Sequence, residues 1–317
     1  MSLVGAAAVA VQVAGVTAGA PLLHGLMRQV RARLEGRAGA GVGQPWRDLR
    51  KLLRKEAVTS LGTGPAFRAA PVLLVATTVV VAALVPLAST DMVVSGSSDL
   101  IVVVALLALG TVTLALAGLD SGTAFGGMGA SREMTLAALV EPTILVSVFA
   151  LSLPTGSTNL PAIVSGALSD PDRLVSPAGL LATAALAVAV LAETGRLPVD
   201  NPSTHLELTM VHEAMVLEYA GPDLALVELG AQMRLTVLLG LLASLFAPWG
   251  IATTASAVSL LIGLVVCAGK VALLGAALAA AEVFWAKLRL FRVPELLAGS
   301  FLLSLLAVTA SYFLSGA

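Results

Sequence analysis

Long apolar blocks are the feature of this sequence that most restricts its fold. Eight of them are close to or above the roughly 20 residues that an α-helix needs to cross the hydrocarbon layer of a membrane. The composition agrees, because 58% of the 317 residues are hydrophobic and only 12% are charged, about half the charged share of a soluble domain. We therefore predict an all-α polytopic membrane protein, one membrane domain over residues 1–317, with spans at residues 3–27, 70–88, 100–119, 135–153, 177–192, 224–246, 253–281 and 296–314.

Two of these blocks need separate comment. The first has no basic residue ahead of it and is longer than the apolar core of a signal peptide, so we expect it to remain as a helix. The sixth carries Glu228 and Arg234 in its first half. These charges leave open whether its membrane portion begins before or after Arg234.

The basic residues are distributed unevenly between the two sides of this predicted bundle. Ten of the 18 lie at residues 28–68, between the first two blocks, and six more fall in the other loops on that side. The opposite side carries only Arg173. Because short loops rich in lysine and arginine stay in the cytoplasm, we expect a multi-pass protein of the cell membrane with both termini outside and its main loops cytoplasmic. Basic residues divided in this way by membrane helices do not form a nucleic-acid-binding face, so no nucleic acid is expected as a partner.

The chain contains a single cysteine, Cys267. One thiol cannot form an internal disulfide, and alone it cannot hold an iron–sulfur cluster or a thiolate zinc site. We therefore expect no metal or redox cofactor to be bound by this chain itself.

The first predicted cytoplasmic loop, residues 28–69, contains an amphipathic helix that begins at Gln44-Pro45. Its apolar and basic side chains fall on opposite faces, as in helices that lie at a membrane surface. Two interpretations remain open and are compatible: the helix anchors to anionic lipid, or it docks a soluble partner. The apolar face comprises Trp46, Leu49, Leu52 and Leu53, and the basic face Arg47, Arg50, Lys51 and Arg54.

The second predicted loop, residues 119–134, is rich in glycine and would let the chain turn sharply between two membrane helices. Glu141-Pro142 follows, about two turns into the fourth predicted span. A carboxylate at that depth costs about 2.5 kcal/mol or more unless it is paired, hydrated or protonated. Glu141 is therefore a candidate functional residue.

The third predicted loop, residues 193–234, is acidic, with seven carboxylates from Glu193 to Glu228. On a continuous helix Glu207 and Glu218 would share a face, and so would His205 and His212. Apolar surroundings raise the pKa of a buried carboxyl group and let it exchange protons near neutrality. A solvated acidic loop is one alternative. A metal site from His205, Glu207 and His212 is another, although the spacing is not that of a zinc-binding helix.

The motifs in these loops resemble a known family. Glu193-x-x-Arg196-x-Pro198-x-Asp200, with Glu207 and Glu218-Tyr219 after it, is similar to the signature of the membrane subunit that seats the quinone-site end of respiratory complex I. The spacing from Gln44-Pro45 through Asp48, Lys51 and Lys55-Glu56 fits the same family. The strings at residues 121–133, 200–213 and 286–295 resemble more closely its homologue in formate hydrogenlyase and other membrane-bound [NiFe]-hydrogenases.

The departures from the quinone-type pattern favour the hydrogenase branch. Ser203 and His205 stand where two glutamates are expected, and extra residues, including His212-Glu213, precede Glu218. The resemblance implies a subunit that clamps a hydrogenase-like large subunit and an iron–sulfur small subunit onto antiporter-like membrane subunits in the lipid bilayer. The [NiFe] centre and iron–sulfur clusters would then lie on those partners.

The same resemblance implies roles for two sets of residues. We expect the third loop to be the coupling element, with Glu207 and Glu218 loading and releasing protons. Proton or sodium movement would involve Glu141, Glu193, Asp200, His205, Glu207, His212, Glu213, Glu218 and Lys270. Docking or structural contacts would involve Gln44, Asp48, Lys51, Lys55, Glu56, Arg132, Arg196, Arg289 and Arg292.

Two charged residues near the end of the seventh block each have two possible roles. Lys270 either continues the ion route towards a partner or pairs with an acid such as Glu141 for structural reasons. Glu282 is close enough to the membrane interface to extend into the headgroups or to be capped.

Two other functions remain as alternatives. A quinone-binding membrane subunit of an NADH:quinone oxidoreductase would use the same signature. A stand-alone secondary transporter would need a substrate site at the membrane midplane and broken helices, whereas the Gly and Pro interruptions here lie mostly near the ends of the blocks.

Overall fold

The computed structural model describes residues 3–60, 62–200, 210–254, 256–286, 288 and 292–315. Three of the predicted site residues, His205, Glu207 and Arg289, lie outside the described residues. Within the described residues the regular structure is helical and contains no strand. The predicted all-α polytopic membrane fold is confirmed.

Seven helices in the described part of the chain are long and apolar enough to cross a membrane. Their apolar side chains can contact lipid or one another, and each helix satisfies its own backbone groups. These helices are α1 (Leu3–Leu34), α3 (Pro65–Leu84), α4 (Leu100–Asp120), α5 (Ala124–Ser152), α10 (Gly221–Phe246), α11 (Ala257–Phe284) and α12 (Val293–Ser315).

The eighth predicted span is the shorter helix α8 (Pro177–Glu193). Its 17 residues correspond to a length of about 25 Å. Ser176 begins it by accepting a hydrogen bond from the Gly179 backbone N–H at 3.1 Å, and Gly195 ends it with a φ of 57° that favours glycine. The prediction of eight equivalent spans therefore becomes seven long helices and one short one, and α8 still packs against α5, α10 and α12.

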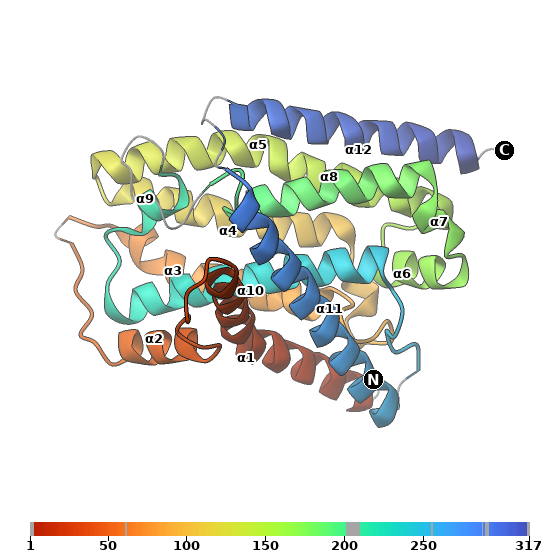
Figure 1. Ribbon diagram of the computed structural model, residues 1–317, viewed down its shortest axis with the longest axis horizontal. Helices are drawn as coiled ribbons and strands as arrows, with labels where there is room; N and C mark the ends of the chain where they lie inside the picture. Colours follow the sequence, from red (N-terminus) through yellow and green to blue (C-terminus); the bar gives the residue numbers. More distant parts are fainter. Residues whose placement is uncertain are drawn as a thin grey trace.

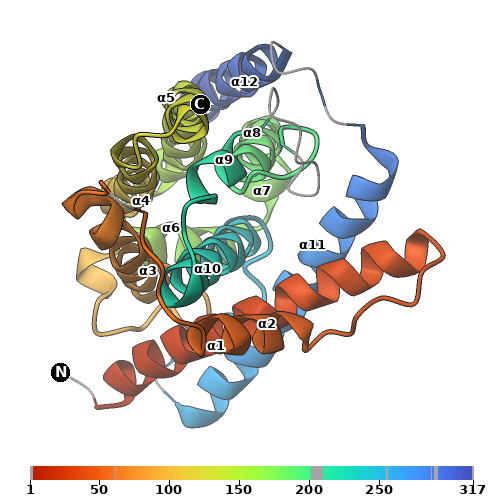
Figure 2. The ribbon, with the colours of Figure 1, turned by 90° about the vertical axis from the view of Figure 1, so that its left-hand side faces the viewer.

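The helices form a bundle with two distinct ends. In Figure 1, α4, α5, α8, α10 and α12 run side by side along the long axis, and α11 crosses them obliquely. The left-hand end holds α2 (Gln44–Leu53) and α9 (His212–Val216), together with the connection between α2 and α3. The right-hand end holds α6 (Leu160–Ser169), α7 (Asp172–Val175) and both chain termini. Seen down the bundle in Figure 2, α10 lies between α3 and α8, whereas α1 and α11 lie at the periphery.

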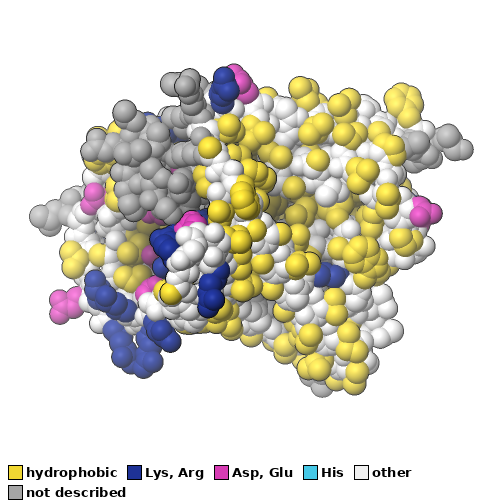
Figure 3. Space-filling model, in the orientation of Figure 1, with side chains coloured by type: hydrophobic (Ala, Val, Ile, Leu, Met, Phe, Trp, Pro, Cys, Tyr) yellow, Lys and Arg dark blue, Asp and Glu magenta, His cyan; other side chains and the backbone are white. Residues whose placement is uncertain are grey.

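Burial distinguishes the central helix from the peripheral ones. In the most apolar part of α10, 78% of the residues are buried, against 11% in α11. Large apolar side chains of α11 point outward, including Leu261, Val265 and Leu273. The basic side chains visible in Figure 3 gather mainly on the left-hand half, and hydrophobic side chains cover the rest of that face. This surface suits lipid or other membrane helices.

The predicted glycine-rich loop, residues 119–134, is mostly helical. α4 continues to Asp120, and Thr123 begins α5 by accepting a hydrogen bond from the Gly126 backbone N–H at 3.1 Å. A side chain at Gly126 would collide with the Gly118 carbonyl. The glycines therefore allow α4 and α5 to pack closely and do not form a long turn. Tertiary contacts override their low helix propensity.

The predicted acidic segment, residues 193–234, is also organised differently. α9 is only five residues long and ends at Val216, so no continuous helix places Glu218 on one face with the residues before Met210. α10 begins at Gly221, so Glu228 and Arg234 lie inside a helix.

The predicted amphipathic helix is present as α2, although α1 extends to Leu34 and shortens the loop that carries it. Pro45 lies in its first turn, where a missing N–H costs nothing. Leu49 is buried and Leu53 is exposed, so only part of the apolar face packs within this chain. α2 packs against α1 and α10.

Candidate functional site

A polar cavity of about 1080 Å³ lies between the helices at the loop-bearing end. Its walls come from α1, α2, α3, α4, α5, α8, α9, α10 and α11, and its outer rim includes exposed residues of the α1–α2 connection. Of the 34 described residues in the lining, 14 are charged, which is unusual inside a membrane bundle. The acidic ones are Glu35, Asp48, Glu133, Glu193, Glu213, Glu228 and Glu282, and the basic ones Arg28, Arg31, Arg37, Lys51, Lys55, Arg196 and Arg234.

A buried ion pair between Glu193 and Arg234 forms the innermost part of this lining. The two side chains are only 3% and 10% exposed, respectively. Arg234 Nη2 also donates hydrogen bonds to Thr111 Oγ1 at 2.6 Å and to the Leu107 carbonyl at 2.7 Å. Removing a charged pair from water is favourable only when the geometry is good and the remaining hydrogen bonds are made, and α4 supplies two of them.

Glu141 lies beside this pair on α5. It is the eighteenth residue of the helix, deeper than the two turns predicted, because α5 begins at Ala124. Its Oε1 atom is buried and has no hydrogen-bond partner among the described residues. Glu193 and Arg234 are its electrostatic neighbours. The structure thus brings Glu141 and Glu193, which the sequence identifies through separate segments, into one cluster.

Three further groups extend this cluster towards the loops: Glu133, Asp200 and His212. Glu133 interacts electrostatically with Glu193, Arg234, Asp200 and Glu141. Burial lowers the pKa of His212 from its ordinary value, and the neighbouring carboxylates of Glu213 and Asp200 only partly oppose this effect. His212 is therefore neutral at physiological pH and can accept or pass a proton without carrying a resident charge.

A second charged cluster closes the cavity between α1 and α11. Glu282 is fully buried and pairs with Arg31, while its Oε1 atom lies 3.7 Å from Arg196 Nη1. Arg196 Nη2 also donates to His24 Nδ1 at 3.2 Å. Burial, with a smaller effect from the Arg31 charge, lowers the pKa of Arg196 to about 10. The expectation that Glu282 extends to the membrane interface is wrong, because two arginines hold it inside the protein.

The predicted docking residues are divided between the cavity and the surface. Asp48, Lys51 and Lys55 line the cavity, and Asp48 accepts a hydrogen bond from Gln44 at 2.8 Å and lies 3.6 Å from Arg28. Arg132 donates to the Met210 carbonyl at 2.8 Å and so ties α5 to the segment before α9. Glu56 and Arg292 are exposed.

Among the described coupling residues, Glu141, Asp200, Glu218 and Lys270 do not line the cavity, and the last two also lie apart from the Glu193 cluster. Glu218 accepts a hydrogen bond from Ser60 Oγ at 2.7 Å, in the connection between α2 and α3. Its neighbour Tyr219 stacks on Phe67 with ring centroids 4.1 Å apart, and burial raises the pKa of Tyr219. These contacts fasten the α9–α10 connection to the start of α3.

Lys270, the second such residue, is held by backbone groups. Its Nζ atom donates to the carbonyls of Ala247 and Trp249, just beyond the end of α10, and lies 5.9 Å from the Trp249 ring centroid. It forms no ion pair with Glu141 in the described part of the chain. The structural alternative of a Lys270–Glu141 pair is therefore wrong.

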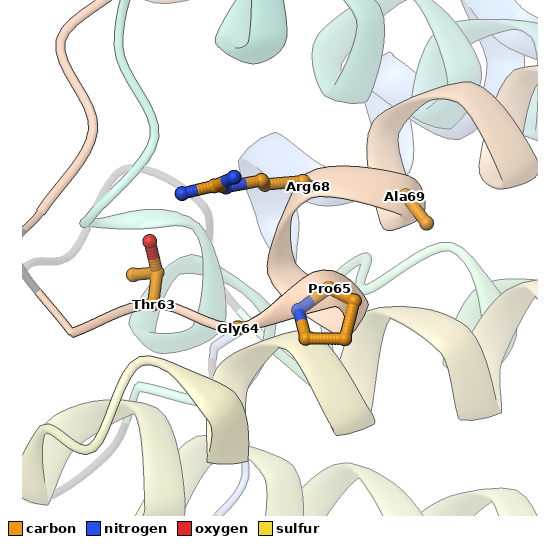
Figure 4. A pocket seen from close by; sticks show the side chains of 5 residues that line it. All are labelled: Thr63, Gly64, Pro65, Arg68 and Ala69. Carbon is orange, nitrogen blue, oxygen red and sulfur yellow. The ribbon is translucent and has the colours of Figure 1, made fainter.

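A separate surface depression lies at the start of α3, shown in Figure 4. It is lined by Thr63, Gly64, Pro65, Arg68 and Ala69, and the Arg68 side chain extends over it. It contains one charged group and is distinct from the polar cavity, so it adds nothing to the candidate site.

Several residues of the cavity are not among the site residues predicted from the sequence. In the sequence analysis, Glu133 is only part of the glycine-rich segment. Glu228 and Arg234 are used there only to ask where the sixth span begins, and Arg31 is used only to orient the bundle. The sequence signal that could identify these four residues is a charged side chain within or next to an apolar block, and each of them fits it. Which charge pairs with which cannot be read from the sequence, since Arg31 and Glu282 are 251 positions apart.

The cavity does not provide an evident metal site. No group of three or more His, Cys, Asp or Glu side chains suited to a metal ion occurs among the residues that the structure describes. Cys267 is a free thiol in α11, apart from the cavity lining. The described residues of the cavity therefore do not fit a resident metal or cluster.

Comparison with known proteins shows what the chain is similar to. The NADH dehydrogenase family model matches residues 6–312. Hydrogenase-4 component C of Escherichia coli (strain K12) is 37% identical over 254 residues, which cover 80% of this chain and 79% of that protein. Formate hydrogenlyase subunit 4 of the same organism is 34% identical over 277 residues, covering 87% of this chain and 89% of that protein.

More distant relatives extend this picture. An NADH-quinone oxidoreductase subunit of Anaplasma phagocytophilum (strain HZ) is 29% identical over 269 residues, covering 78% of this chain and 76% of that protein. A chain of the membrane-bound sulfane sulfur reductase, an archaeal respiratory membrane complex, has a TM-score of 0.80 and 18% identity, covering 96% of this chain and 98% of that chain. The structural likeness supports the fold, and the family model covers nearly every residue. The chain therefore belongs to the NADH dehydrogenase family, the family of complex I subunit 1.

Proposed function

We propose that this chain is the membrane-anchoring and ion-coupling subunit of a complex I-like, hydrogenase-type oxidoreductase. It docks a soluble redox arm at the loop-bearing end and couples electron transfer there to proton or sodium movement. The observation that carries the proposal is the charged cavity, which extends from the α1–α2 connection to the buried Glu193–Arg234 pair. Isolated charges are costly at this depth, so a connected set of them indicates an ion pathway.

The relatives favour the hydrogenase branch of this family. The hydrogenase-4 and formate hydrogenlyase subunits are 37% and 34% identical to this chain, against 29% for the NADH-quinone oxidoreductase subunit of Anaplasma. On this basis the partners are a hydrogenase-like large subunit and an iron–sulfur small subunit, with antiporter-like membrane subunits beside the apolar outer helices. Any redox centre, including a [NiFe] centre, lies on those partners.

The coupling roles follow from position in the cavity. Glu213, His212 and Glu133 lie towards the loops and can exchange protons with water that enters there. Glu193 and Glu141 lie deeper, where a proton leaves the cavity for the membrane helices. His205 and Glu207 belong to the same loop by sequence and keep their predicted coupling role. Gln44, Arg132 and Arg196 hold the walls of the cavity in place.

A quinone-binding subunit is the second candidate in the same family. The described residues that line the cavity include no Phe, Tyr or Trp, whereas pockets for small organic ligands are lined mainly by apolar and aromatic side chains. The lack of aromatic side chains in this lining favours water and ions over a quinone ring, while aliphatic residues such as Leu74 and Leu114 give part of it an apolar surface. A stand-alone transporter remains the candidate of a different class, and partner identification distinguishes it.

The first experiment is purification of the tagged chain from native membranes in mild detergent, with identification of its partners and analysis of nickel and iron. We expect a nickel- and iron-containing complex with a large hydrogenase-like subunit. Quinone-linked activity without nickel would favour the quinone branch instead. A chain that purifies alone and transports a solute would refute both.

The second experiment tests coupling in inverted membrane vesicles that contain the intact complex. Glu141→Gln should abolish ion uptake driven by the redox reaction, because the uncharged amide cannot load and release a proton. The matched control is Glu295→Gln, which removes an exposed carboxylate in the first turn of α12. Coupled uptake at wild-type rates in an assembled Glu141→Gln complex would contradict the proposal.

A further inference from the structure

Glu193 stands between two charged groups on different helices. It is the last residue of α8, and α8 packs against both α5 and α10. Arg234 lies on α10 and Glu141 on α5. Both carboxylates interact electrostatically with the one guanidinium. Glu193 and Glu141 therefore share Arg234 as a nearby cation, and Glu133 also interacts with it.

The guanidinium of Arg234 is held on one side only. Its Nη2 atom makes the contacts to Glu193, Thr111 and the Leu107 carbonyl. Its Nε atom is buried and has no hydrogen-bond partner among the described residues. A buried charged donor without a partner is costly, so this arrangement leaves part of the guanidinium's hydrogen-bonding capacity unused.

Glu141 lacks a hydrogen-bond donor, just as Arg234 Nε lacks an acceptor. Its buried Oε1 atom accepts no hydrogen bond from the described residues, although Arg234 is within electrostatic range. A carboxylate in this position needs either a proton or a cation. The cation that could satisfy it is engaged with Glu193 in this structure.

The guanidinium lies directly against α4. Gly110 on α4 faces it, and a Cβ atom added there would lie 3.3 Å from both Arg234 Nη1 and Thr77 Oγ1. The absence of a side chain at Gly110 thus allows this close approach, in which Thr111 Oγ1 and the Leu107 carbonyl accept hydrogen bonds from Arg234.

We propose that Arg234 is a shared cation that pairs alternately with Glu193 and Glu141, and so determines which of the two carboxylates holds a proton. The exchange begins with Arg234 against Glu193, as in the structure, and with a proton on Glu141. When Glu193 takes a proton from cavity water, Arg234 moves to Glu141, which then releases its proton to the next acceptor along the pathway. One proton enters and one leaves, and the charge of the cluster is unchanged.

This exchange deepens the proposed function and rests on it, since it names the residue that links the cavity to the deeper carboxylate. It also gives a role to the second carboxylate, Glu141, beside an ion pair that is already complete. A permanent pair would stabilise the protein equally well with Glu141 replaced by an apolar residue.

The test is the position of the Arg234 guanidinium in structures of the whole complex, compared between wild type, Glu193→Gln and Thr111→Val. Glu193→Gln removes the competing charge, and Thr111→Val keeps the side-chain shape but removes the hydroxyl that holds Nη2. In Glu193→Gln we expect the guanidinium to move to Glu141, with an N–O distance of about 3 Å. In Thr111→Val, which keeps the Glu193 charge but loosens Nη2, we expect it at Glu141 in part of the molecules. The control Glu295→Gln should leave it against Glu193.

A guanidinium that stays against residue 193 and the Leu107 carbonyl in both variants would overturn the proposal. Thr111→Val retains every charge, so it keeps the test decisive if Glu193→Gln fails to assemble. The measurement is independent of ion transport. A movement of Arg234 in a complex that moves no ions would therefore refute the proposed function and leave the shared cation intact, whereas ion transport with a fixed Arg234 would refute only the exchange.

Discussion

Arg234 and Lys270 are both cations inside long apolar helices, yet their surroundings differ in kind. Arg234 lies on the central helix α10, pairs with a carboxylate and lines the charged cavity. Lys270 lies on the peripheral helix α11 and bonds to the carbonyls of Ala247 and Trp249. Carbonyls just past a helix end carry partial negative charge that does not titrate. A cation at membrane depth therefore indicates an ion path only when its partner can take up a proton.

The largest expected effect comes from removing the charge of Arg234. Arg234→Gln leaves Glu193 buried without its cation, which we expect to lower the free energy of unfolding by about 3–5 kcal/mol. Chemical unfolding of the full chain in detergent measures it. The double variant with Glu193→Gln should recover most of the loss, because both charges are then absent. A single-variant loss below about 1 kcal/mol would show that the pair behaves like an exposed one.

Lys270→Met tests the other cation of the comparison. It keeps the length and apolar character of the stem but removes the charged donor to two carbonyls, so we expect a loss of about 2 kcal/mol in unfolding free energy. Redox-driven ion uptake in vesicles should stay at the wild-type level. Loss of uptake in an assembled complex would return Lys270 to the ion path that its sequence position suggests.

The neutral state of His212 makes the stability depend on pH near neutrality. Its folded-state pKa lies below the unfolded value of 6.5, so on acidification the unfolded chain binds the proton first and stability falls as the pH drops below about 6.5. Each pH unit in that window contributes up to about 1.4 kcal/mol. His212→Gln should lose less stability than wild type between pH 7 and pH 5, measured by unfolding at each pH. Parallel losses would show that His212 is not buried neutral.

The smallest expected effect concerns the close approach of the guanidinium to α4. Gly110→Ala adds a methyl group 3.3 Å from Arg234 Nη1, and we expect a loss of about 1 kcal/mol together with reduced coupling. Gly269→Ala is the matched control, because a Cβ there meets nothing within 4 Å. Equal effects of the two substitutions on coupled uptake would argue against a specific role for the space at Gly110.

Much of the architecture is predictable because membrane helices must each be apolar over a fixed length. All eight predicted blocks correspond to helices, and the basic loops do lie at one end of the bundle. The predicted boundaries fail where tertiary contacts override local preference. Gly126 falls in a predicted loop, but in the structure it lets α5 pack on α4.

The candidate site is predictable in part and for a related reason. Glu141 and Glu193 stand out in the sequence because a carboxylate in apolar surroundings is costly and so is seldom without a role. Glu218 belongs to the same family motif as Glu193, yet it lies against Ser60, apart from the cavity lining. A motif identifies residues that matter to a family but does not say which of them share a cavity.

The sequence by itself determined the membrane class, the helical blocks, the charged end of the bundle and the family resemblance, since these follow from composition and order along the chain. Only the tertiary structure decided the pairings: Arg234 with Glu193, Glu282 with Arg31 and Arg196, and Lys270 with backbone carbonyls. The physical reason is that a buried charge is stabilised by whatever group lies within a few ångströms of it. That distance is set by how distant helices pack, which local sequence does not encode.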